Sequence, residues 1–403
     1  MKLGDCDEPT HVWQYAERFL GGGTRTYSRF SADLDISRRY HPQYGDESVT
    51  LPTFRVPDTD GVYLRNGIDS DLHDLYRGDG WFLLPVHPDT LSLPSLFGRE
   101  RLLRLPSGPT LRAVHTANAR TVLVRQVGER TVEPHFLKLH YPRRLSRFGR
   151  RLRRPTIELQ LWVSAELHRA GVPFLPEVGG GAYGRDTAEA WGYLLRERRL
   201  LGGSLRYTVP LFALYGADVR APGDPTLLEQ LVERLGLGAA ELLADRIVAP
   251  LVTLWWRILR ATGCLAEPHG QNALVTFDTD GVGIGYRDCG IYVDAAVRAA
   301  QGLGGDLPPR NVIPQHVDKD PAQVRSLVYD TFLGHHALSY LARLAEQRLG
   351  VPPRVLHEAA RRAFREAADP ALPLPATVYN YDDRLHPDGA WHLVDTGKPP
   401  VWR

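Results

Sequence analysis

Five polar residues within 22 positions give this chain its clearest chemical signal, and they are Glu267, His269, Gln271, Asn272 and Asp288. Two short apolar runs, residues 273–277 and 282–286, lie between them and are joined by the turn sequence Asp-Thr-Asp-Gly. This pattern predicts a β-hairpin, which brings its two ends side by side. A carboxylate, an amide and an imidazole would then converge on one point. Hard oxygen ligands of this kind suit Mg²⁺ that carries a nucleotide triphosphate.

The individual roles follow from residue type. Asp288 stands at the expected end of the second strand, where a carboxylate can reach a metal ion. Asn272 offers the neutral oxygen that kinases also place beside an aspartate for Mg²⁺. Glu267 could bind a second metal or a ribose hydroxyl. The alternative is a set of polar residues that cap a loop between a helix and a strand, but five of them bracketing one hairpin favour a functional site.

Lysine is rare here, with four lysines against 45 arginines. Lys138 lies in a strand-like segment, residues 135–141, whose alternation puts it on one face with Phe136 and His140, away from the leucines. Arginine cannot always replace a compact ammonium group against a phosphate or a carboxylate. Lys138 is therefore a candidate anion ligand, and a lysine on a solvated strand face is the alternative.

A basic cluster follows Lys138, because residues 143–154 contain seven arginines and Arg120 precedes them. Nucleic-acid binding is one interpretation. The net charge of +2 and the lack of interleaved aromatic residues disfavour it. We expect one or two arginines to face phosphates and a substrate carboxylate, with which arginine forms bidentate pairs. The others would form a solvated helix face.

His87 stands between a valine and a proline in the segment Pro-Val-His-Pro. A histidine held rigidly by neighbouring prolines suits a positioned acid, base or substrate donor. A lone histidine in a turn is more often structural, so both interpretations remain open. The run of glycines at residues 21–23 has no Lys-Ser/Thr context and is not interpreted as a phosphate-binding loop.

The elements that must position these residues predict an α+β protein. A chain of 403 residues can bury a large core in about two lobes. Residues 1–110 suggest turns, short strands and irregular structure, residues 121–126 and 135–141 a strand pair, and residues 191–199 a strand or short helix. Hydrophobic periodicity predicts helices over residues 157–170, 227–235, 240–261, 324–349 and 353–368. We therefore expect a β-containing lobe over residues 1–199, a mainly helical lobe over 200–403 that carries the hairpin, and a nucleotide site between them.

Composition restricts the class of protein. No run of about 18 apolar residues is present, so no membrane span is expected, and the first residues lack the apolar region of a signal peptide. The three cysteines, Cys6, Cys264 and Cys289, have no metal-ligand spacing and fit a reducing compartment. We expect a cytoplasmic protein in which Cys264 and Cys289 are small buried side chains.

At this point the motifs resemble a known family. The segment Glu-Pro-His-Gly-Gln-Asn at residues 267–272, followed by Arg287 and Asp288, resembles the signature of the IucA/IucC family, the NRPS-independent siderophore (NIS) synthetases. Weaker matches follow the family's order at residues 30–44, 85–88, 118–121, 136–139, 146–150 and 195–197. The resemblance runs from about residue 15 to near the end of the sequence.

The resemblance implies a two-lobed, hand-like fold in which fingers and palm grip ATP with Mg²⁺. It implies adenylation of a carboxylic acid, often citrate-like, followed by attack of an amine, hydroxylamine or alcohol. By position it implies that ATP is bound by Arg120, Thr121, Lys138, Arg150, His269, Gln271 and Asn272, of which Arg120, Lys138, Arg150 and His269 are catalytic. It also implies that His87, Asn118 and Ser146 face the substrate carboxylate, and that Glu267, Asn272 and Asp288 hold the metal.

The sequence departs from the family pattern in three places. Family members are commonly longer and start with a thumb-like region that is missing here, and an early His-Pro motif is eroded to residues 21–25. Asn118 replaces a serine and Ser146 a threonine. Because the nucleotide motifs are better preserved than the carboxylate motifs, we expect ATP binding with an altered acid or amine.

Two alternatives remain open at the level of sequence. The first is a kinase-like small-molecule phosphotransferase, which would release ADP rather than AMP and pyrophosphate. The second is a non-catalytic partner of a full-length synthetase. The expected partners are a small carboxylic acid and an amine or hydroxyl nucleophile, with neither nucleic acid nor membrane. A homodimer is compatible with the resemblance, although nothing in the sequence identifies a dimer face.

Overall fold

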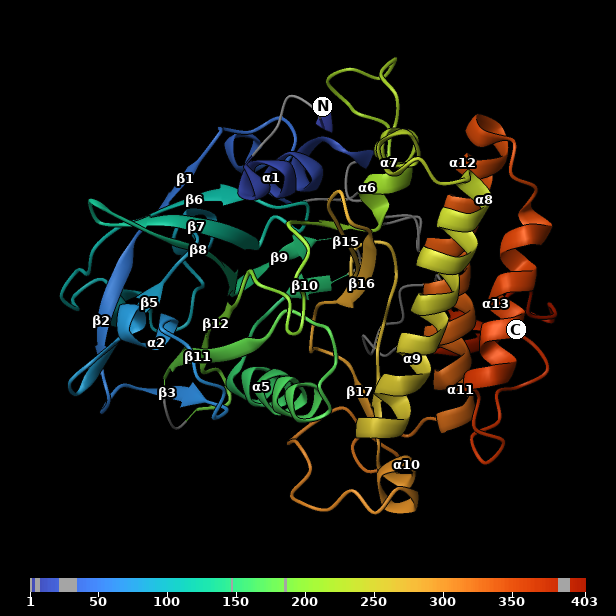
Figure 1. Cartoon of the computed structure of the whole chain (residues 1–403). Coiled ribbons are helices and arrows are strands. Elements are labelled where there is room, and N and C mark those ends of the chain that lie inside the picture. The colour runs from blue at the N-terminus through green and yellow to red at the C-terminus, as the bar shows by residue number, and fades with distance from the viewer. Residues whose placement is uncertain (1, 4–7, 22–34, 146–147, 185–186, 383–391) are drawn as a thin grey trace.

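The computed structural model describes residues 2–3, 8–21, 35–145, 148–184, 187–382 and 392–403. It is a mixture of helices and strands, so the predicted α+β class is confirmed (Figure 1). Strands gather on one side of the molecule and long helices on the other (Figure 1).

The strand-rich side is built on a seven-stranded antiparallel sheet. Its strands in spatial order are β1 (Val49–Leu51), β6 (Leu111–His115), β7 (Thr121–Val127), β8 (Arg130–Leu139), β12 (Trp191–Arg196), β11 (Glu177–Tyr183) and β3 (Gly61–Arg65). A second sheet joins β2 (Thr53–Pro57), β5 (Trp81–Pro85) and β4 (Arg77–Gly78). Short helices precede or connect these strands: η3 (Arg38–Tyr40), α2 (Leu72–Tyr76), α3 (Pro88–Leu91) and α4 (Arg99–Leu102). The predicted pairing of residues 121–126 with 135–141 is confirmed by the β7–β8 register, and residues 191–196 form a strand.

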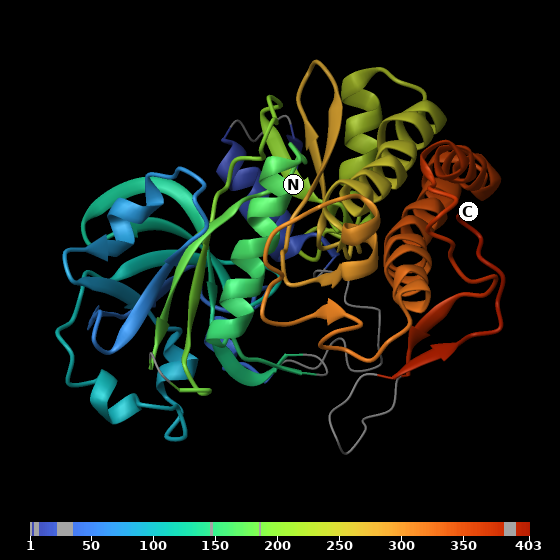
Figure 2. The same ribbon diagram turned by 90° about the horizontal axis from the view of Figure 1, so that it is seen from below.

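Helix α5 (Arg154–Arg169) lies between the sheet and the helical side of the molecule (Figure 2). Ile157 and Leu161, one turn apart, pack with Ala182 and Leu194 of the sheet. A second stripe of the same helix, Leu159, Val163 and Leu167, belongs to the helical core. The helix therefore buries two apolar faces at once, each with the four-residue spacing of an α-helix.

The helical side contains two long runs whose hydrogen-bond pattern changes along their length. The first consists of α8 (Ala239–Glu241), the π-helical η4 (Leu242–Val248) and α9 (Ala249–Thr262), and it ends at Gly263 with a φ of 70°. The second consists of α11 (Pro321–Ser326), the π-helical η5 (Leu327–Leu338) and α12 (Ser339–Leu349). The predicted helices at 240–261 and 324–349 are confirmed, and the two π-helical segments were not anticipated.

The remaining elements surround these runs. The helices are α6 (Phe212–Tyr215), α7 (Leu227–Leu235), α10 (Ala295–Ala300) and α13 (Pro353–Ala367). The strands are β9 (Tyr141–Leu145), β10 (Phe148–Arg150), β13 (Tyr207–Pro210), β14 (Cys264–Leu265), β15 (Ala273–Phe277), β16 (Val282–Tyr286), β17 (Tyr292–Asp294), β18 (Val312–Ile313), β19 (Tyr379–Tyr381) and β20 (Leu393–Asp395). The predicted helices at 227–235 and 353–368 are thus confirmed.

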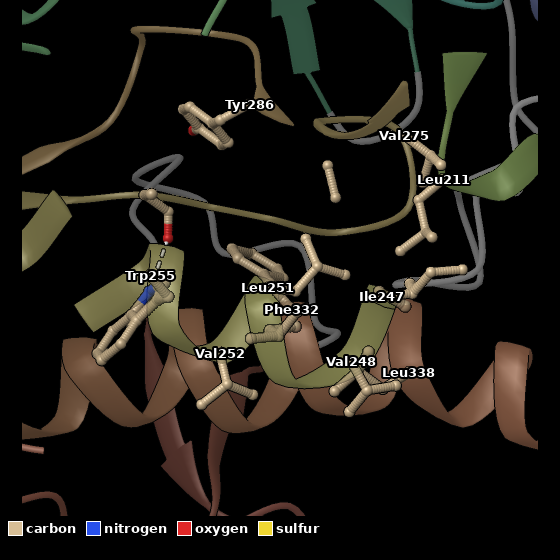
Figure 3. Close-up of a cluster of buried hydrophobic side chains, with 14 of the residues drawn as sticks. Leu211, Ile247, Val248, Leu251, Val252, Trp255, Val275, Tyr286, Phe332 and Leu338 are labelled. Atoms are coloured by element: carbon tan, nitrogen blue, oxygen red, sulfur yellow. Dashed lines mark hydrogen bonds between the residues drawn. The ribbon is translucent and has the colours of Figure 1, made fainter. Parts of the chain in front are cut away.

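A continuous apolar core joins the helical runs to the hairpin β15–β16 (Figure 3). Val248, Leu251 and Trp255 of the first helical run belong to the same buried cluster as Val275 and Tyr286 of the hairpin. The indole Nε1 of Trp255 donates to the carbonyl of Ala266 at 3.2 Å, so a buried polar atom has its partner. Since Ala266 directly precedes Glu267, this core supports the polar segment that the sequence singled out.

Helix α1 (Pro9–Phe19) was not predicted, because residues 1–110 suggested turns and irregular structure. Its start has two clear causes: the Glu8 carboxylate accepts from the N–H groups of Thr10 and His11, and Pro9 occupies the first turn. Val12 and Ala16, four residues apart and fully buried, attach the helix to the helical core. The helical spacing was present in the sequence but was obscured by the glycine-rich segment that follows.

Among the described residues, no helix has both the length and the apolar character needed to cross a bilayer. Cys264 and Cys289 are free thiols fully buried in the helical core, and burial raises the pKa of Cys264 to about 12. Both behave as small buried side chains, as expected. Cys6 lies outside the described residues.

Four buried histidines of the strand-rich side predict that the folded state loses stability as the pH is lowered. Burial lowers the pKa of His87 and His135 to about 4, and of His115 and His140 to about 3. In the unfolded chain each has a pKa of about 6.5. Below that pH the unfolded state binds more protons than the folded state, so the free energy of unfolding falls as the pH decreases from about 6.5 toward 4. Each histidine contributes a slope of up to about 1.4 kcal/mol per pH unit.

The variant His135→Gln tests this expectation, because glutamine can still accept from the Tyr76 hydroxyl that now donates to His135 Nε2 at 2.7 Å. Urea unfolding at pH 7, 6 and 5 should show a smaller loss of stability on acidification than in the parent chain. The exposed His316, changed to Gln, is the matched control and should leave the slope unchanged. Equal slopes for His135→Gln and the parent would contradict the assignment.

Candidate active site

A cavity of about 260 Å³ contains most of the residues that the sequence predicted. Nine of the twelve predicted site residues line it: Asn118, Arg120, Lys138, Arg150, Glu267, His269, Gln271, Asn272 and Asp288. They come from the strand-rich side, from β9–β10 and from the hairpin on the helical side. The lining is completed by Gln160, Gly290, Ile291, Tyr292, Asn311, Phe332 and Tyr381.

The hairpin β15–β16 brings the two halves of the sequence motif together, as predicted. Ala273 pairs with Tyr286 at the open end of the hairpin. The backbone N–H of Arg287 donates to the carbonyl of Asn272 at 2.9 Å. A tight turn at the far end and antiparallel pairing therefore place Asn272 beside Asp288 across the mouth of the hairpin.

Lys138 is the central cation of the cavity, and it is 1% exposed. Its ammonium donates to Asp288 Oδ1 at 2.7 Å and to Gln160 Oε1, and it lies 3.7 Å from Glu177 Oε1. Burial lowers the pKa of Lys138, whereas the two carboxylates act in the opposite direction. The ammonium is therefore held by two hydrogen-bond acceptors and one further carboxylate, which come from three separate parts of the chain.

Asp288 has a backbone φ of 86°, a region that residues other than glycine rarely adopt. Its Oδ1 also accepts from the N–H of Gly290 at 2.9 Å. Burial alone would raise the pKa of Asp288, but the charges of Lys138 and Arg196 hold that pKa well below its usual range. The carboxylate is therefore ionised, and its strained backbone is typical of functional positions.

The loop from Glu267 to Asn272 folds back on itself. The N–H of Asn272 donates to the carbonyl of His269 at 2.9 Å, and the side-chain Nδ2 of Asn272 donates to the carbonyl of Glu267 at 3.2 Å. Gly270 is required at its position, because a Cβ there would lie 2.0 Å from the Tyr215 hydroxyl oxygen. Its N–H donates to the carbonyl of His336 in η5 at 3.3 Å, which fixes the loop to the helical core.

Protonation differs along this loop. Burial, together with the charge of Asp288, raises the pKa of Glu267 to about 8. Burial lowers the pKa of His269 to about 4, so its imidazole is neutral at pH 7. The effect of Asp288 on Glu267 shows that the two carboxyl groups lie close enough to interact.

Glu267, Asn272 and Asp288 fit a magnesium ion in donor chemistry, since two carboxyl groups and an amide oxygen are the hard ligands that Mg²⁺ prefers. All three residues line the same cavity. A bound cation would reduce the electrostatic repulsion between the carboxyl groups of Glu267 and Asp288. In the described part of the chain, no group of three or more His, Cys, Asp or Glu residues forms a metal cluster. The assignment of Glu267, Asn272 and Asp288 as metal ligands stays a prediction.

Two donors in the cavity wall are buried without a hydrogen-bond partner among the described residues: Arg120 Nε and Gln271 Nε2. The Nη1 of Arg120 donates to the carbonyl of Arg150 at 3.3 Å. Burial, reinforced by the charge of Arg150, lowers the pKa of Arg120 to about 10. Since buried donors are normally satisfied, this wall is suited to a ligand rich in anionic acceptors.

Three predicted residues do not line the cavity. Thr121 is buried in β7, where it pairs with Lys138 in the sheet. His87 caps α3, its Nδ1 accepting from the N–H of Asp89 at 3.1 Å, and its ring packs against Tyr40 and Tyr141. Ser146 lies outside the described residues. The proposed contact of His87 with a substrate carboxylate finds no support in the cavity lining.

The sequence motifs missed an aromatic wall on the helical side. Phe332 of η5 lies with its ring centroid 5.9 Å from that of His269 and 6.0 Å from that of Tyr381. Tyr292 of β17 lines the same cavity. Gln160 of α5 was missed as well, although it accepts from Lys138. None of these residues had a spacing or chemical type that distinguished it from ordinary core and helix residues.

The fold is similar to those of two aerobactin synthetases and a petrobactin biosynthesis protein. ATP-bound aerobactin synthetase IucA from a hypervirulent pathotype of Klebsiella pneumoniae matches with a TM-score of 0.66 at 17% identity, over 88% of this chain and 70% of that chain. Aerobactin synthetase IucC from a hypervirulent pathotype of the same species matches with a TM-score of 0.57 at 17% identity, over 88% and 72%. Petrobactin biosynthesis protein AsbB from Bacillus anthracis str. Sterne matches with a TM-score of 0.61 at 12% identity, over 89% and 72%. The resemblance predicted from the motifs is thereby confirmed at the level of the fold.

Comparisons of sequence alone add one match. A protein-family model described as ferric iron reductase FhuF-like transporter matches residues 241–386, just over a third of the chain. This segment includes the whole polar motif from Glu267 to Asp288. None of the curated proteins matches the chain significantly.

Proposed function

We propose that this chain, which has the fold of the IucA, IucC and AsbB synthetases, is an ATP-dependent acyl-adenylating ligase. It would activate a carboxylic acid, citrate-like or altered, and join it to an amine, a hydroxylamine or an alcohol in the biosynthesis of a siderophore or related product. The observation that carries the proposal is the cavity in which Arg120, Lys138 and Arg150 face the Glu267–Asn272 loop and Asp288. One of the similar structures, IucA, is described as ATP-bound, which supports ATP as the nucleotide.

The reaction has two steps. A carboxylate oxygen of the acid attacks the α-phosphorus of ATP, the bond to the β-phosphate oxygen breaks, and pyrophosphate leaves. The amine or hydroxyl then attacks the acyl carbon, loses a proton and releases AMP. Negative charge builds up on the phosphorus and on the leaving pyrophosphate during the first step, and stabilising such charge is usually the largest catalytic contribution.

Different residues of this chain would have different roles in this reaction. The ammonium of Lys138 and the guanidinium groups of Arg120 and Arg150 are preorganised positive charges for phosphate oxygens and the substrate carboxylate. Gln271 and the neutral His269 would donate hydrogen bonds to the nucleotide. Glu267, Asn272 and Asp288 would hold Mg²⁺, which when bound supplies a Lewis acid for the phosphate oxygens.

A hand-like arrangement of two lobes, residues 1–199 as fingers and 200–403 as palm, forms part of the proposal. Two large and separate buried apolar clusters support it, one centred on the sheets and one on the helices. Val12, Ala16 and Leu159, from the first 199 residues, also belong to the helical cluster, so the two proposed lobes would share part of this core. ATP and Mg²⁺ are supplied in the cytoplasm, which is the compartment that this activity would require.

ATP–pyrophosphate exchange tests the function directly. With Mg²⁺ and a panel of citrate, succinate, 2-oxoglutarate, amino acids and citryl conjugates, we expect exchange that depends on one class of acid. With the matching nucleophile added, AMP should form in proportion to product. Formation of ADP with an acceptor would instead identify a phosphotransferase. Bound ATP with neither exchange nor ADP would identify a non-catalytic partner of a complete synthetase.

A further inference from the structure

The carboxylate of Glu17, in helix α1, is 1% exposed and accepts hydrogen bonds from three groups. Trp13 Nε1 donates to Oε1 at 3.1 Å, the backbone N–H of Ala117 donates to Oε2 at 3.1 Å, and Arg287 Nη1 donates to Oε1. These partners come from three different parts of the chain, and Glu17 itself does not line the cavity.

The contact with Ala117 reaches one wall of the cavity. Ala117 precedes Asn118 and Arg120 in the turn between β6 and β7, and both of those residues line the cavity. Ala119, inside the same turn, has a φ of 58°. A backbone N–H bonded to a buried carboxylate is a charge-assisted contact, which fixes the turn more firmly than a neutral one would.

The contact with Arg287 reaches the opposite wall. Arg287 Nε donates to the carbonyl of Gln271 at 2.8 Å, and its backbone N–H donates to the carbonyl of Asn272 at 2.9 Å. The next residue is Asp288. Arg287, through its guanidinium and its backbone N–H, thus joins Glu17 to the open end of the hairpin β15–β16.

We infer that Glu17 is a positioning residue that fixes the Asn118–Arg120 turn relative to the Gln271–Asp288 hairpin end. The effect on turnover rests on the proposed function, because the two walls must hold phosphates and carboxylate in one geometry. A misplacement of about 1 Å at a distance from the reacting atoms can reduce catalysis about a hundredfold. A carboxylate is required because all three neighbours are donors, and the amide group of a glutamine would face one of them with a second donor.

Glu17→Gln in the full chain tests the inference. Hydrogen–deuterium exchange should show loss of protection both at residues 116–121 and at residues 269–273, which are far apart in the sequence. The exchange assay should show kcat lower by about a hundredfold, with the KM for ATP changed by less than about tenfold. A role limited to stability would not separate kcat from KM in this way.

The matched control is Glu166→Gln. Glu166 is 5% exposed and accepts from Arg298 Nη1 at 2.7 Å, so it also belongs to a buried Glu–Arg pair, but neither residue lines the cavity. We expect this variant to lower the melting temperature. Neither kcat nor the protection from deuterium exchange at residues 116–121 and 269–273 should change. A second variant, Arg287→Lys, keeps the charge but cannot reach Glu17 and Gln271 together, and it should reproduce the kcat loss even if Glu17→Gln does not fold.

Unchanged protection in both segments of Glu17→Gln, or full activity in Arg287→Lys, would overturn the inference. If the parent chain shows no pyrophosphate exchange with any acid, the proposed function fails instead. The deuterium measurement then still decides the role of Glu17, because it requires neither substrate nor turnover.

Discussion

Lys138→Ala is expected to abolish acid-dependent ATP–pyrophosphate exchange, with a loss of about a thousandfold or more. The ammonium is the cation buried deepest in the cavity, and it is held by Asp288, Gln160 and Glu177. Its removal takes away positive charge at the point where phosphate charge would develop. Exchange should be measured at saturating ATP and acid, so that weaker binding does not hide the effect on the chemical step.

The fold should survive this change, because Glu177 keeps its ion pair with Arg196, whose Nη2 donates to it at 2.5 Å. Breaking a buried ion pair still lowers stability, by about 3–5 kcal/mol when one charge is left without a partner. Circular dichroism and a melting curve therefore accompany the assay. The exposed Lys398, changed to Ala, is the matched control and should retain full activity. Normal exchange by a folded Lys138→Ala would rule out the phosphate-holding role.

Asp288→Asn is expected to weaken Mg²⁺-dependent binding of ATP by about tenfold to a hundredfold. Asparagine is one of the few residues that tolerate a positive φ, so the backbone at 86° can be kept while the charge is lost. The measurement is the rise in melting temperature with ATP in the presence of Mg²⁺, compared with ATP and a chelator. In the parent chain the first should exceed the second. In the variant the two should become equal.

Asp280→Asn, at the turn end of the same hairpin, is the control for this experiment. Asp280 is exposed and lies at the end of the hairpin opposite Asp288. The variant should show the same Mg²⁺-dependent stabilisation as the parent. If Asp288→Asn also kept that stabilisation, the metal assignment would be wrong, and the carboxylate would serve only to orient Lys138.

Local signals in the sequence predicted much of this architecture. The hairpin at residues 273–286 was readable because an Asp-Gly turn separates two apolar runs, and the long helices were readable from their periodicity. Because Glu267, Asn272 and Asp288 lie just outside the two ends of that hairpin, the predicted strand pairing already placed them close together. Nine of the twelve predicted residues consequently line one cavity.

Contacts between distant segments could not be predicted in this way. Arg287 and Glu17 are 270 positions apart, and no sequence pattern in either segment indicates that the two residues are in contact. Lys138 and Asp288, 150 positions apart, could be placed in one site only through the family resemblance. The aromatic wall from Phe332 and Tyr381 was missed for the same reason, since buried aromatic residues are common and give no sign of which cavity they face.

The separation of these partners along the chain has a consequence for folding. Glu17 can meet Arg287 only after the 270 positions that separate them have been synthesised. Contacts of such high contact order form late and slow the folding reaction. A ligand that contacts both walls would therefore bind only after both of these distant segments have folded and come together. Its binding would stabilise the native state against global unfolding rather than against the opening of any one segment.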